Sequence, residues 1–474
     1  MAEKGLEARP MTTGTRHAVH RVGRDHCLAP SRTVGAPAGG ARYGHMFPDL
    51  PSLICDIPAL HAAGEPGGVC DAAAAQEVPD GGGDDAAGAA GWPFFGQVIA
   101  HDITADRSPI GPHADLAALR NARSPKLNLE IVYGQGPVGA PYLYDLHDPP
   151  KLLTGAHGLD LPRNSQGIAL IGDPRNDVHI FAAHVHLALL HSHNGLVNRL
   201  RADGEPEAEL FEAARRALTR HYQWIIVHDF LPRLVGTQVA SDVLAHGGRF
   251  FSPPPGEAYV PLEFADAAYR YGHSQIRHTY QLQPGGPAFP LFPDLAGLGP
   301  ITPEHRVDLG QLFDLPGHTP AQRAKRMDGA LPASLIRLPG QVTGEVDVDA
   351  YRSLAVRDLL RGAATSLPSG ETVAAALGIA PLTASQVGPG WAAGTPLWFY
   401  ILKEAQALGA GNQLGPVGGR IVAEVLLGLL RADPDAYLTA DPSWTPTLPS
   451  RDGTSFGLTD LLLFAADQLP RGVA

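Results

Sequence analysis

Apolar side chains recur at helical spacing over about six turns in residues 179–201, HIFAAHVHLALLHSHNGLVNRLR. A second long helix is expected over residues 207–236, because acidic residues open this segment and Pro232 and Gly236 mark its end. Further helices are expected over residues 262–280, 350–361, 396–408 and 416–431. The sequence shows no repeat and no sustained strand alternation. This pattern predicts a mainly α-helical protein.

Glycine and proline are frequent, at 55 and 44 of 474 residues. Length alone suggests about three domains, but so many turn-forming residues also fit long connections within one domain. Residues 64–91 are rich in small residues and poor in large apolar ones, which is typical of a loop or a partly disordered segment. We therefore expect an irregular, partly disordered region at residues 1–90 and a single large, loop-rich helical domain at residues 91–474.

The charge balance and the apolar pattern exclude two classes of protein. The chain has 36 Lys and Arg against 48 Asp and Glu, a formal charge of −12, and no basic run, so we expect no nucleic-acid partner. No apolar stretch approaches the roughly 18 to 20 residues of a membrane span. The N-terminal segment has no apolar core that would mark a secretory signal. We expect a cytoplasmic protein, with secretion by a signal-less route left open.

The chain has 21 histidines but only three cysteines, Cys27, Cys55 and Cys70. No CxxC motif is present, so neither a disulfide framework nor a cysteine metal site is predicted. Histidine is the side chain of proton transfer and metal ligation near neutral pH. Its abundance directs attention to motifs that contain it.

The segment WPFFGQVIAHDIT contains the first candidate motif. If it is helical, Gln97 and His101 are four residues apart and share a face, where an amide and an imidazole can bind a small polar molecule. Asp102 points about a quarter turn away and is free to serve a cation. The alternative for this motif alone is an ordinary capped histidine at a helix end.

Two further motifs add an arginine and a second histidine. In GDPRNDVHI, Arg175 follows a tight turn and can present a rigid donor fork, although pairing with a neighbouring aspartate is the alternative. In EFADAAYRYGHSQIRHTYQL, His273 follows Gly272 within the expected helix, and Arg270 can reach the same face. A histidine with a satisfied place in the core is the alternative there.

Two other patterns are interpreted as incidental. The four histidines within 179–201 pair at seven-residue spacing and not at the i, i+4 spacing of a helical zinc site, so we interpret His184, His186, His191 and His193 as structural. The sequence GTSFG around Ser455 matches the GxSxG nucleophile elbow. That elbow needs a buried strand before the serine, and the preceding DPSWTPTLPSRD cannot form one.

Together, QxxxHD, then GDxR about 70 residues later, then RYGH about 100 residues further on resemble the animal-type haem peroxidases of the peroxidase–cyclooxygenase superfamily. FPDLP, VYG, HYQWIIVHDFLPRLVG, TPLWFYILKEA and LGPVGGRIVAEVLLGLL are similar to the bacterial branch of that superfamily. The resemblance covers roughly residues 45–465. It implies one helical domain with haem buried between central helices.

By position, the resemblance implies a role for each motif residue. His101 corresponds to the distal histidine, Gln97 to the distal amide and Arg175 to the catalytic arginine. His273 corresponds to the proximal iron ligand, and Arg270 to an arginine near a haem propionate. The residue that hydrogen-bonds the proximal histidine is not located by the motifs.

The resemblance also implies a possible calcium site. Asp102 would be completed by the loop SPKLNLEIVYG, in which Ser124, Asn128 and Glu130 offer side-chain oxygens and Lys126 offers its carbonyl. These are ligands suited to calcium. Asn128 replaces the usual carboxylate, so we expect weaker calcium binding.

Departures from the mammalian members narrow the expected chemistry. Ala100 and Val178 stand where those members have ester-forming acids, so we expect non-covalent haem b and less strongly oxidising iron, which disfavours chloride oxidation. Arg270 stands at the position of the cyclooxygenase radical tyrosine, between Tyr269 and Tyr271, which disfavours fatty-acid dioxygenase chemistry.

The resemblance implies a haem peroxidase that reduces hydrogen peroxide and oxidises a small organic donor or a halide. His101 would act as general base and then acid, and Arg175 would stabilise charge on the departing oxygen. An oxygenase or oxidative tailoring enzyme of secondary metabolism on the same fold is the alternative. A haem-binding or sensing protein and a Ser455 hydrolase are weaker alternatives.

Overall fold

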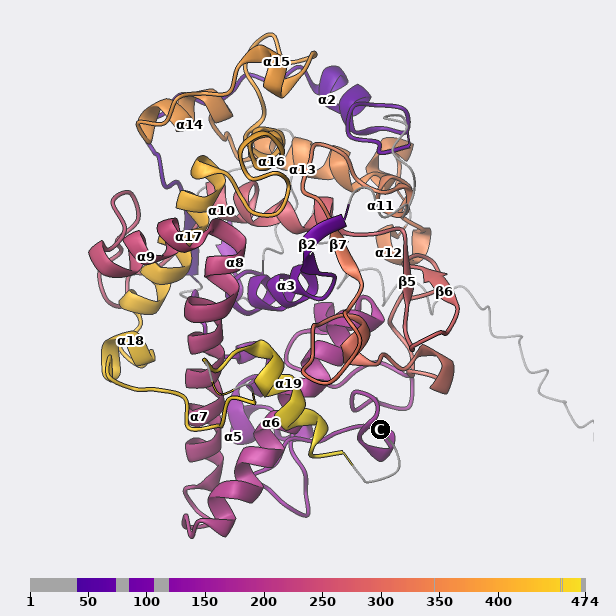
Figure 1. The fold of residues 1–474 in the computed structure, drawn as a ribbon, viewed down its shortest axis with the longest axis vertical. Coiled ribbons are helices and arrows are strands. Elements are labelled where there is room, and N and C mark those ends of the chain that lie inside the picture. Colours follow the sequence, from indigo (N-terminus) through magenta and orange to yellow (C-terminus); the bar gives the residue numbers. More distant parts are fainter. Residues whose placement is uncertain are drawn as a thin grey trace, which may run out of the picture.

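Helix α3 (Trp92–Ile103) lies near the centre of the molecule, with α6 and α7 on one side and α13 and α16 on the other (Figure 1). The computed structural model describes residues 41–73, 85–105, 119–344, 346–451, 453 and 455–469. Within these ranges the chain is mainly helical and forms one large domain, as predicted. None of the helices in the described part is long and apolar enough to cross a membrane.

The two long helices predicted from apolar spacing are confirmed, the second with an irregular end. Helix α6 covers Ile180–Ala202, and the His179 side chain caps it by accepting a hydrogen bond from the Ala182 N–H. The predicted segment 207–236 contains α7 (Leu210–Ile225), a π-helical turn at Ile226–Phe230 and α8 (Leu231–Val235). Helices α6 and α7 pack against each other and form the base of the domain.

The prediction of one continuous helix over residues 262–280 is wrong. This stretch contains α10 (Leu262–Ala265), the 3₁₀ helix η6 (Ala268–Gln275) and the first residues of β5 (Thr279–Gln281). The backbone leaves helical geometry at Ala267, with φ −138° and ψ −77°. The guanidinium of Arg270 donates to the Ala265 carbonyl at 3.0 Å, so a side chain satisfies a carbonyl that a continuing helix would have bonded.

The later predicted helices are confirmed. They are α13 (Leu354–Ala364), α16 (Leu397–Leu408) and α17 (Pro416–Ala432). The remaining α-helices in the described part are α2 (Ile57–Gly64), α4 (Glu130–Tyr133), α5 (Gly136–Gly139), α9 (Thr237–His246), α11 (Ala333–Ile336), α12 (Gly340–Thr343), α14 (Gly370–Ala376), α15 (Ala384–Val387), α18 (Tyr437–Ala440) and α19 (Leu458–Ala466).

Strands in the described part are short and join segments that are distant in sequence. Strand β1 (Ala41–Gly44) pairs antiparallel with β3 (Arg120–Asn121) and parallel with β4 (Val260–Pro261). Two further pairs are antiparallel: β2 (Asp85–Ala89) with β7 (Arg323–Lys325), and β5 with β6 (Ala288–Pro290). These short strands connect loop segments that are far apart in the chain.

The expectation of an irregular region up to residue 90 needs correction in its described part. Residues 41–73 contain β1 and α2, and residues 85–89 form β2. Met46, Phe47 and Leu60 are buried in the main core, so this part belongs to the domain. Residues 1–40, with Cys27, lie outside the described residues. Cys55 and the buried Cys70 are both free thiols.

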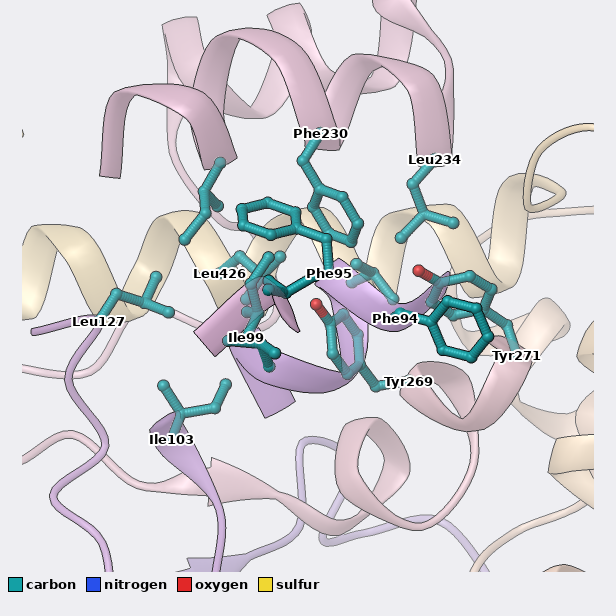
Figure 2. Packing of buried hydrophobic residues seen from close by; sticks show 14 of the residues in the cluster. Phe94, Phe95, Ile99, Ile103, Leu127, Phe230, Leu234, Tyr269, Tyr271 and Leu426 are labelled. Carbon is teal, nitrogen blue, oxygen red and sulfur yellow. The ribbon is translucent and has the colours of Figure 1, made fainter. Parts of the chain in front are cut away.

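Buried aromatic side chains hold α3 in the core. Phe95 lies edge-on to Phe230 with ring centroids 5.7 Å apart, and Phe230 lies edge-on to Tyr269 of η6 at 6.5 Å. Figure 2 shows these side chains together with Ile99 and Ile103 of α3. Each fully buried large apolar side chain contributes about 1.5–3 kcal/mol. The packing therefore fixes α3, which carries Gln97 and His101.

Candidate active site

A cavity of about 230 Å³ lies between α3, the turn before α6, η6 and α13. Its lining includes Gln97 and His101 from α3, Arg175 from the 3₁₀ turn η4 (Pro174–Asp177), and Arg270 and His273 from η6. The three sequence motifs, which are separated by 70 to 100 residues, therefore meet at one cavity. Packing of α3 against η6 brings the two histidine-bearing elements together.

His273 is anchored by a carboxylate that no sequence motif pointed to. Its Nδ1 lies 2.6 Å from Oδ2 of Asp358, which is fully buried on α13. We assign the Nδ1 proton to this bond, because the carboxylate can only accept. No described residue bonds Nε2, and this nitrogen is available to a ligand in the cavity.

Arg270 shares the same carboxylate. Its Nη1 donates to Oδ1 of Asp358 at 3.0 Å, and its Nη2 lies 3.4 Å from Asp266. Arg357 and Arg361 of α13 also line the cavity, and Arg361 donates to Asp266 at 2.9 Å. The structure thus places three guanidinium groups and two buried carboxylates on one side of the cavity. Cationic groups of this kind suit carboxylates of a bound molecule.

His101 is the first member of a buried polar chain. Its Nδ1 lies 2.7 Å from Oδ1 of Asn176, and Nδ2 of Asn176 lies 2.9 Å from Nδ1 of His186. The amide fixes the direction of both bonds, because its oxygen only accepts and its nitrogen only donates. His101 therefore carries its proton on Nδ1, and Nε2 is the basic nitrogen. His186, predicted to be purely structural, belongs to this chain.

Burial also determines the charge of His101 and His179. Burial, reinforced by the Arg175 guanidinium, lowers the pKa of His101 to about 3. Burial likewise lowers the pKa of His179 to about 3. Both imidazoles are therefore neutral at pH 7, which is the form a general base requires.

Arg175 combines both interpretations considered from the sequence. It pairs with Asp173, whose Oδ1 accepts from Nε at 3.0 Å and whose Oδ2 accepts from Nη2 at 2.8 Å. Nη2 also donates to the carbonyls of His101 and Thr104. Its bonds hold the guanidinium at the cavity wall beside His101. The ion pair with Asp173 therefore orients the Arg175 guanidinium, which still lines the cavity.

Gln97 is fixed by a histidine that the sequence analysis overlooked. The Ala182 N–H donates to Nδ1 of His179, so the proton of that imidazole lies on Nε2, which donates to Oε1 of Gln97 at 2.8 Å. The amide nitrogen of Gln97 is left as a donor at the cavity wall. A signal for His179 is present in the sequence, because a polar side chain directly before a long helix is placed to cap it.

The side chain of each of the five residues predicted to bind calcium has a partner within the protein. Asp102 accepts from the N–H groups of Leu129 and Ile131, at 2.9 and 3.4 Å. Glu130 accepts from Arg123 and from the Ser124 hydroxyl, Asn128 accepts from the Glu130 N–H, and the Lys126 ammonium pairs with Asp433. No cluster of three or more His, Cys, Asp or Glu suited to a metal ion occurs in the ranges the structure describes.

The remaining candidates lie outside the site. His184, His191 and His193 bond backbone carbonyls at 2.7, 2.7 and 2.8 Å, which agrees with a structural role. Ser455 is exposed and lies three residues before the first residue of α19. The described residues that lead up to it form no strand, which the nucleophile elbow would need. Neither group forms a second catalytic centre.

The animal haem peroxidase family model matches residues 111–287. This match covers less than half of the chain. A peroxidase-like protein from Margaritifera margaritifera is 32% identical over 126 residues, which is 24% of this chain and 15% of that protein. Heme peroxidase 2 from Caenorhabditis elegans is 26% identical over 175 residues, or 32% of this chain and 24% of that protein. The matches thus span less than a quarter of each relative's length.

Solved structures extend the similarity of fold to almost the whole chain. Peroxidase A from Dictyostelium discoideum superposes with a TM-score of 0.63 at 15% identity, covering 95% of this chain and 97% of that one. A fatty acid alpha-dioxygenase from Oryza sativa gives a TM-score of 0.57 at 14% identity, with coverage of 97% and 88%. The fold is therefore the one shared by animal haem peroxidases and alpha-dioxygenases.

The residues at the cavity fit haem, the group named in the description of the matching family model. Nδ1 of His273 is held by Asp358, so Nε2 is the nitrogen that would bind the iron of a haem. A Cβ atom added at Gly272 would meet only Pro93, at 3.7 Å, so the backbone next to His273 is open to a flat group. Ala100 and Val178 both line the cavity and offer no carboxylate for an ester bond.

Proposed function

We propose that the protein is a haem-dependent peroxidase that reduces hydrogen peroxide and oxidises a small organic donor or a halide. The observation that carries this proposal is the meeting of His101, Arg175 and His273 at one cavity. A placement in the bacterial branch of the family rests on the motifs quoted above and stays a prediction. Non-covalent attachment of haem b is likewise inferred from Ala100 and Val178.

Each residue has a role that its contacts permit. His273 would hold a bound haem through Nε2, and the haem would supply the redox chemistry that peroxide reduction needs. Nε2 of His101 takes the proton from the peroxide oxygen that binds and returns it to the oxygen that leaves, while Nδ1 stays bonded to Asn176. The Arg175 guanidinium, fixed by Asp173, stabilises negative charge on the departing oxygen. The Gln97 amide can hold a water or a halide beside His101.

Two alanine variants test these roles separately. In His101→Ala, the haem-loaded protein should keep its Soret absorption, but its reaction with peroxide should slow by about 10²- to 10⁴-fold, the usual contribution of general acid–base catalysis. In His273→Ala, haem should be lost or its absorption spectrum changed. A His101→Ala protein that reacts with peroxide at the wild-type rate would refute the distal assignment.

An oxygenase acting on an organic substrate is the second candidate. It is favoured by the apolar part of the cavity wall, which includes Leu335, Leu338 and Val342. Product analysis separates the two functions. An oxygenase incorporates labelled oxygen from ¹⁸O₂ into the product. A peroxidase that removes electrons from its donor one at a time does not need O₂ to form the oxidised product.

A further inference from the structure

Arg123 is a buried arginine in the loop where calcium ligands were predicted. Its side chain is only 7% exposed. Nη1 donates to Oε1 of Glu130 at 2.9 Å, and Nη2 donates to the carbonyl of Gly172 at 2.8 Å and to Oδ2 of Asp173 at 2.6 Å. Nε also donates to Oδ2 of Asp173, at 3.2 Å. One guanidinium therefore ties the loop at 123–130 to the turn that carries Arg175.

Asp173 is shared between two arginines. Its Oδ1 accepts from the backbone and from Nε of Arg175, at 2.9 and 3.0 Å. Its Oδ2 accepts from Nη2 of Arg175 at 2.8 Å and from Arg123. Although burial favours the neutral form, the guanidinium groups of Arg175 and Arg123 hold the pKa of Asp173 well below its usual range. Asp173 is thus an ionised bridge between them.

A calcium ion does not fit this loop as it is built. The Glu130 carboxylate, the strongest predicted donor of the loop, is taken up by Arg123 and Ser124. Asp102 uses both oxygens on backbone N–H groups, and burial raises its pKa to about 7. A divalent cation at Glu130 would have to displace a guanidinium that already supplies positive charge there.

We propose that Arg123 is the resident cation of this loop and a positioning residue for Arg175, so that the distal site keeps its geometry without calcium. The link through Arg175 rests on the proposed peroxidase function. The independence from calcium does not rest on it, because it concerns only how the loop is held.

The first test uses the haem-loaded wild-type protein with calcium or with a chelator. Thermal unfolding is measured in excess EGTA and in millimolar CaCl₂. The melting temperature and the Soret spectrum should be the same in both. A melting temperature that falls in EGTA and returns with calcium would overturn the proposal, whether or not the protein reacts with peroxide.

The second test compares Arg123→Ala, Arg123→Lys and a matched control, Arg163→Ala. Arg163 is equally buried, at 7% exposure, and pairs with Asp160 and with Asp177 at the end of η4, so it anchors the same turn without contacting Asp173. Both alanine variants should lower the melting temperature. Only Arg123→Ala should slow the peroxide reaction, by about 10- to 100-fold, the penalty of a misplaced catalytic group. Arg123→Lys should restore part of that rate.

The outcomes are distinct. A wild-type rate in folded Arg123→Ala, or an equal loss of rate in Arg163→Ala, would overturn the positioning role. If Arg123→Ala does not fold, Arg123→Lys decides, because a lysine keeps the charge but cannot span Glu130 and Asp173 with a fork. A rate indistinguishable from wild type in Arg123→Lys would then count against the geometric role. A wild-type protein that is inert to peroxide would instead refute the proposed function.

Discussion

The Oδ2 atom of Asp358 lies 2.6 Å from Nδ1 of His273, while Oδ1 of the same carboxylate lies 3.0 Å from Nη1 of Arg270. Asp358 is fully buried, so this short bond is not weakened by water. A carboxylate on Nδ1 makes the opposite nitrogen of the imidazole more electron-rich. The electron density on Nε2 of His273 is thus influenced by a residue on α13, which is far from His273 in sequence.

Replacing this carboxylate should change the iron more than the fold. In Asp358→Asn, the amide oxygen still accepts from His273, but the negative charge is gone. We expect the ferric–ferrous midpoint potential to rise by on the order of 100 mV, the Coulomb effect of one charge roughly an imidazole ring away. Potentiometric titration of the haem-loaded protein measures this. Asp266→Asn is the control, because Asp266 contacts Arg270 and Arg361 but not His273. A potential that moves equally in both variants would contradict the specific role of Asp358.

The amide between His101 and His186 should matter for the reaction with peroxide. In Asn176→Ala, His101 loses the acceptor that keeps its proton on Nδ1. We expect the peroxide reaction to slow by about 10- to 100-fold with haem binding retained, because a fraction of the imidazoles then adopts the wrong tautomer. Stopped-flow absorbance measures the rate. Asn194→Ala is the matched control, because Asn194 bonds only the backbone of Leu152 in the contacts seen here. Its rate should be close to that of the wild type.

Haem should be extractable without breaking a covalent bond. Ala100 and Val178 line the cavity and carry no carboxylate that could form an ester with a bound haem. Treatment of the haem-loaded protein with acid and an organic solvent should remove the pigment completely. The extracted pigment should give the pyridine haemochrome spectrum of unmodified haem b. Pigment that stays with the precipitated protein would contradict this prediction.

Stability should fall steeply in mild acid. Burial lowers the pKa to about 3 for His101 and His179, and to about 4 for His184, His186, His193 and His221. Below about pH 6.5 the unfolded chain protonates these groups and the folded chain does not, so the unfolded state gains protons and stability decreases as pH falls. Asp102 and Glu404, whose pKa values burial raises to about 7, act in the opposite direction.

The histidines outnumber these two acids. The net difference of about four protons corresponds to at most about 5 kcal/mol per pH unit. Because the total stability of a folded protein is of order 5–15 kcal/mol, we expect acid unfolding of the haem-free protein with a midpoint between about pH 4 and 6. Near-ultraviolet circular dichroism against pH measures it. A native spectrum at pH 4 would contradict the burial of neutral histidines.

The fold could be predicted from sequence where a helix buries a periodic apolar face. Helix α6 agrees with its prediction, because its apolar residues follow the helical period and His179 caps it. Segment 262–280 fails because its local composition favours a helix, whereas the tertiary bond from Arg270 to the Ala265 carbonyl ends it. Strands of two to five residues, such as β1 with β4, have no local signal, since they exist only through pairing of distant segments.

The site could be predicted in its motif residues but not in the residues that support them. His101, Arg175 and His273 stand in recognisable local patterns. Asp358 and Asn176 hold His273 and His101 through long-range hydrogen bonds, and no spacing in the chain marks them. The calcium prediction rests on the oxygen donors of the loop, and no pattern in the sequence indicated that Arg123 bonds Glu130.

The most direct test of the central claim is the absorption spectrum of the 474-residue chain after loading with haem, recorded before and after addition of hydrogen peroxide. We predict a Soret band from haem bound through His273, and we expect this band to shift within the mixing time when peroxide is added. A protein that stays colourless after haem loading would contradict the assignment of the cavity. A Soret band that peroxide leaves unchanged would contradict the peroxidase function.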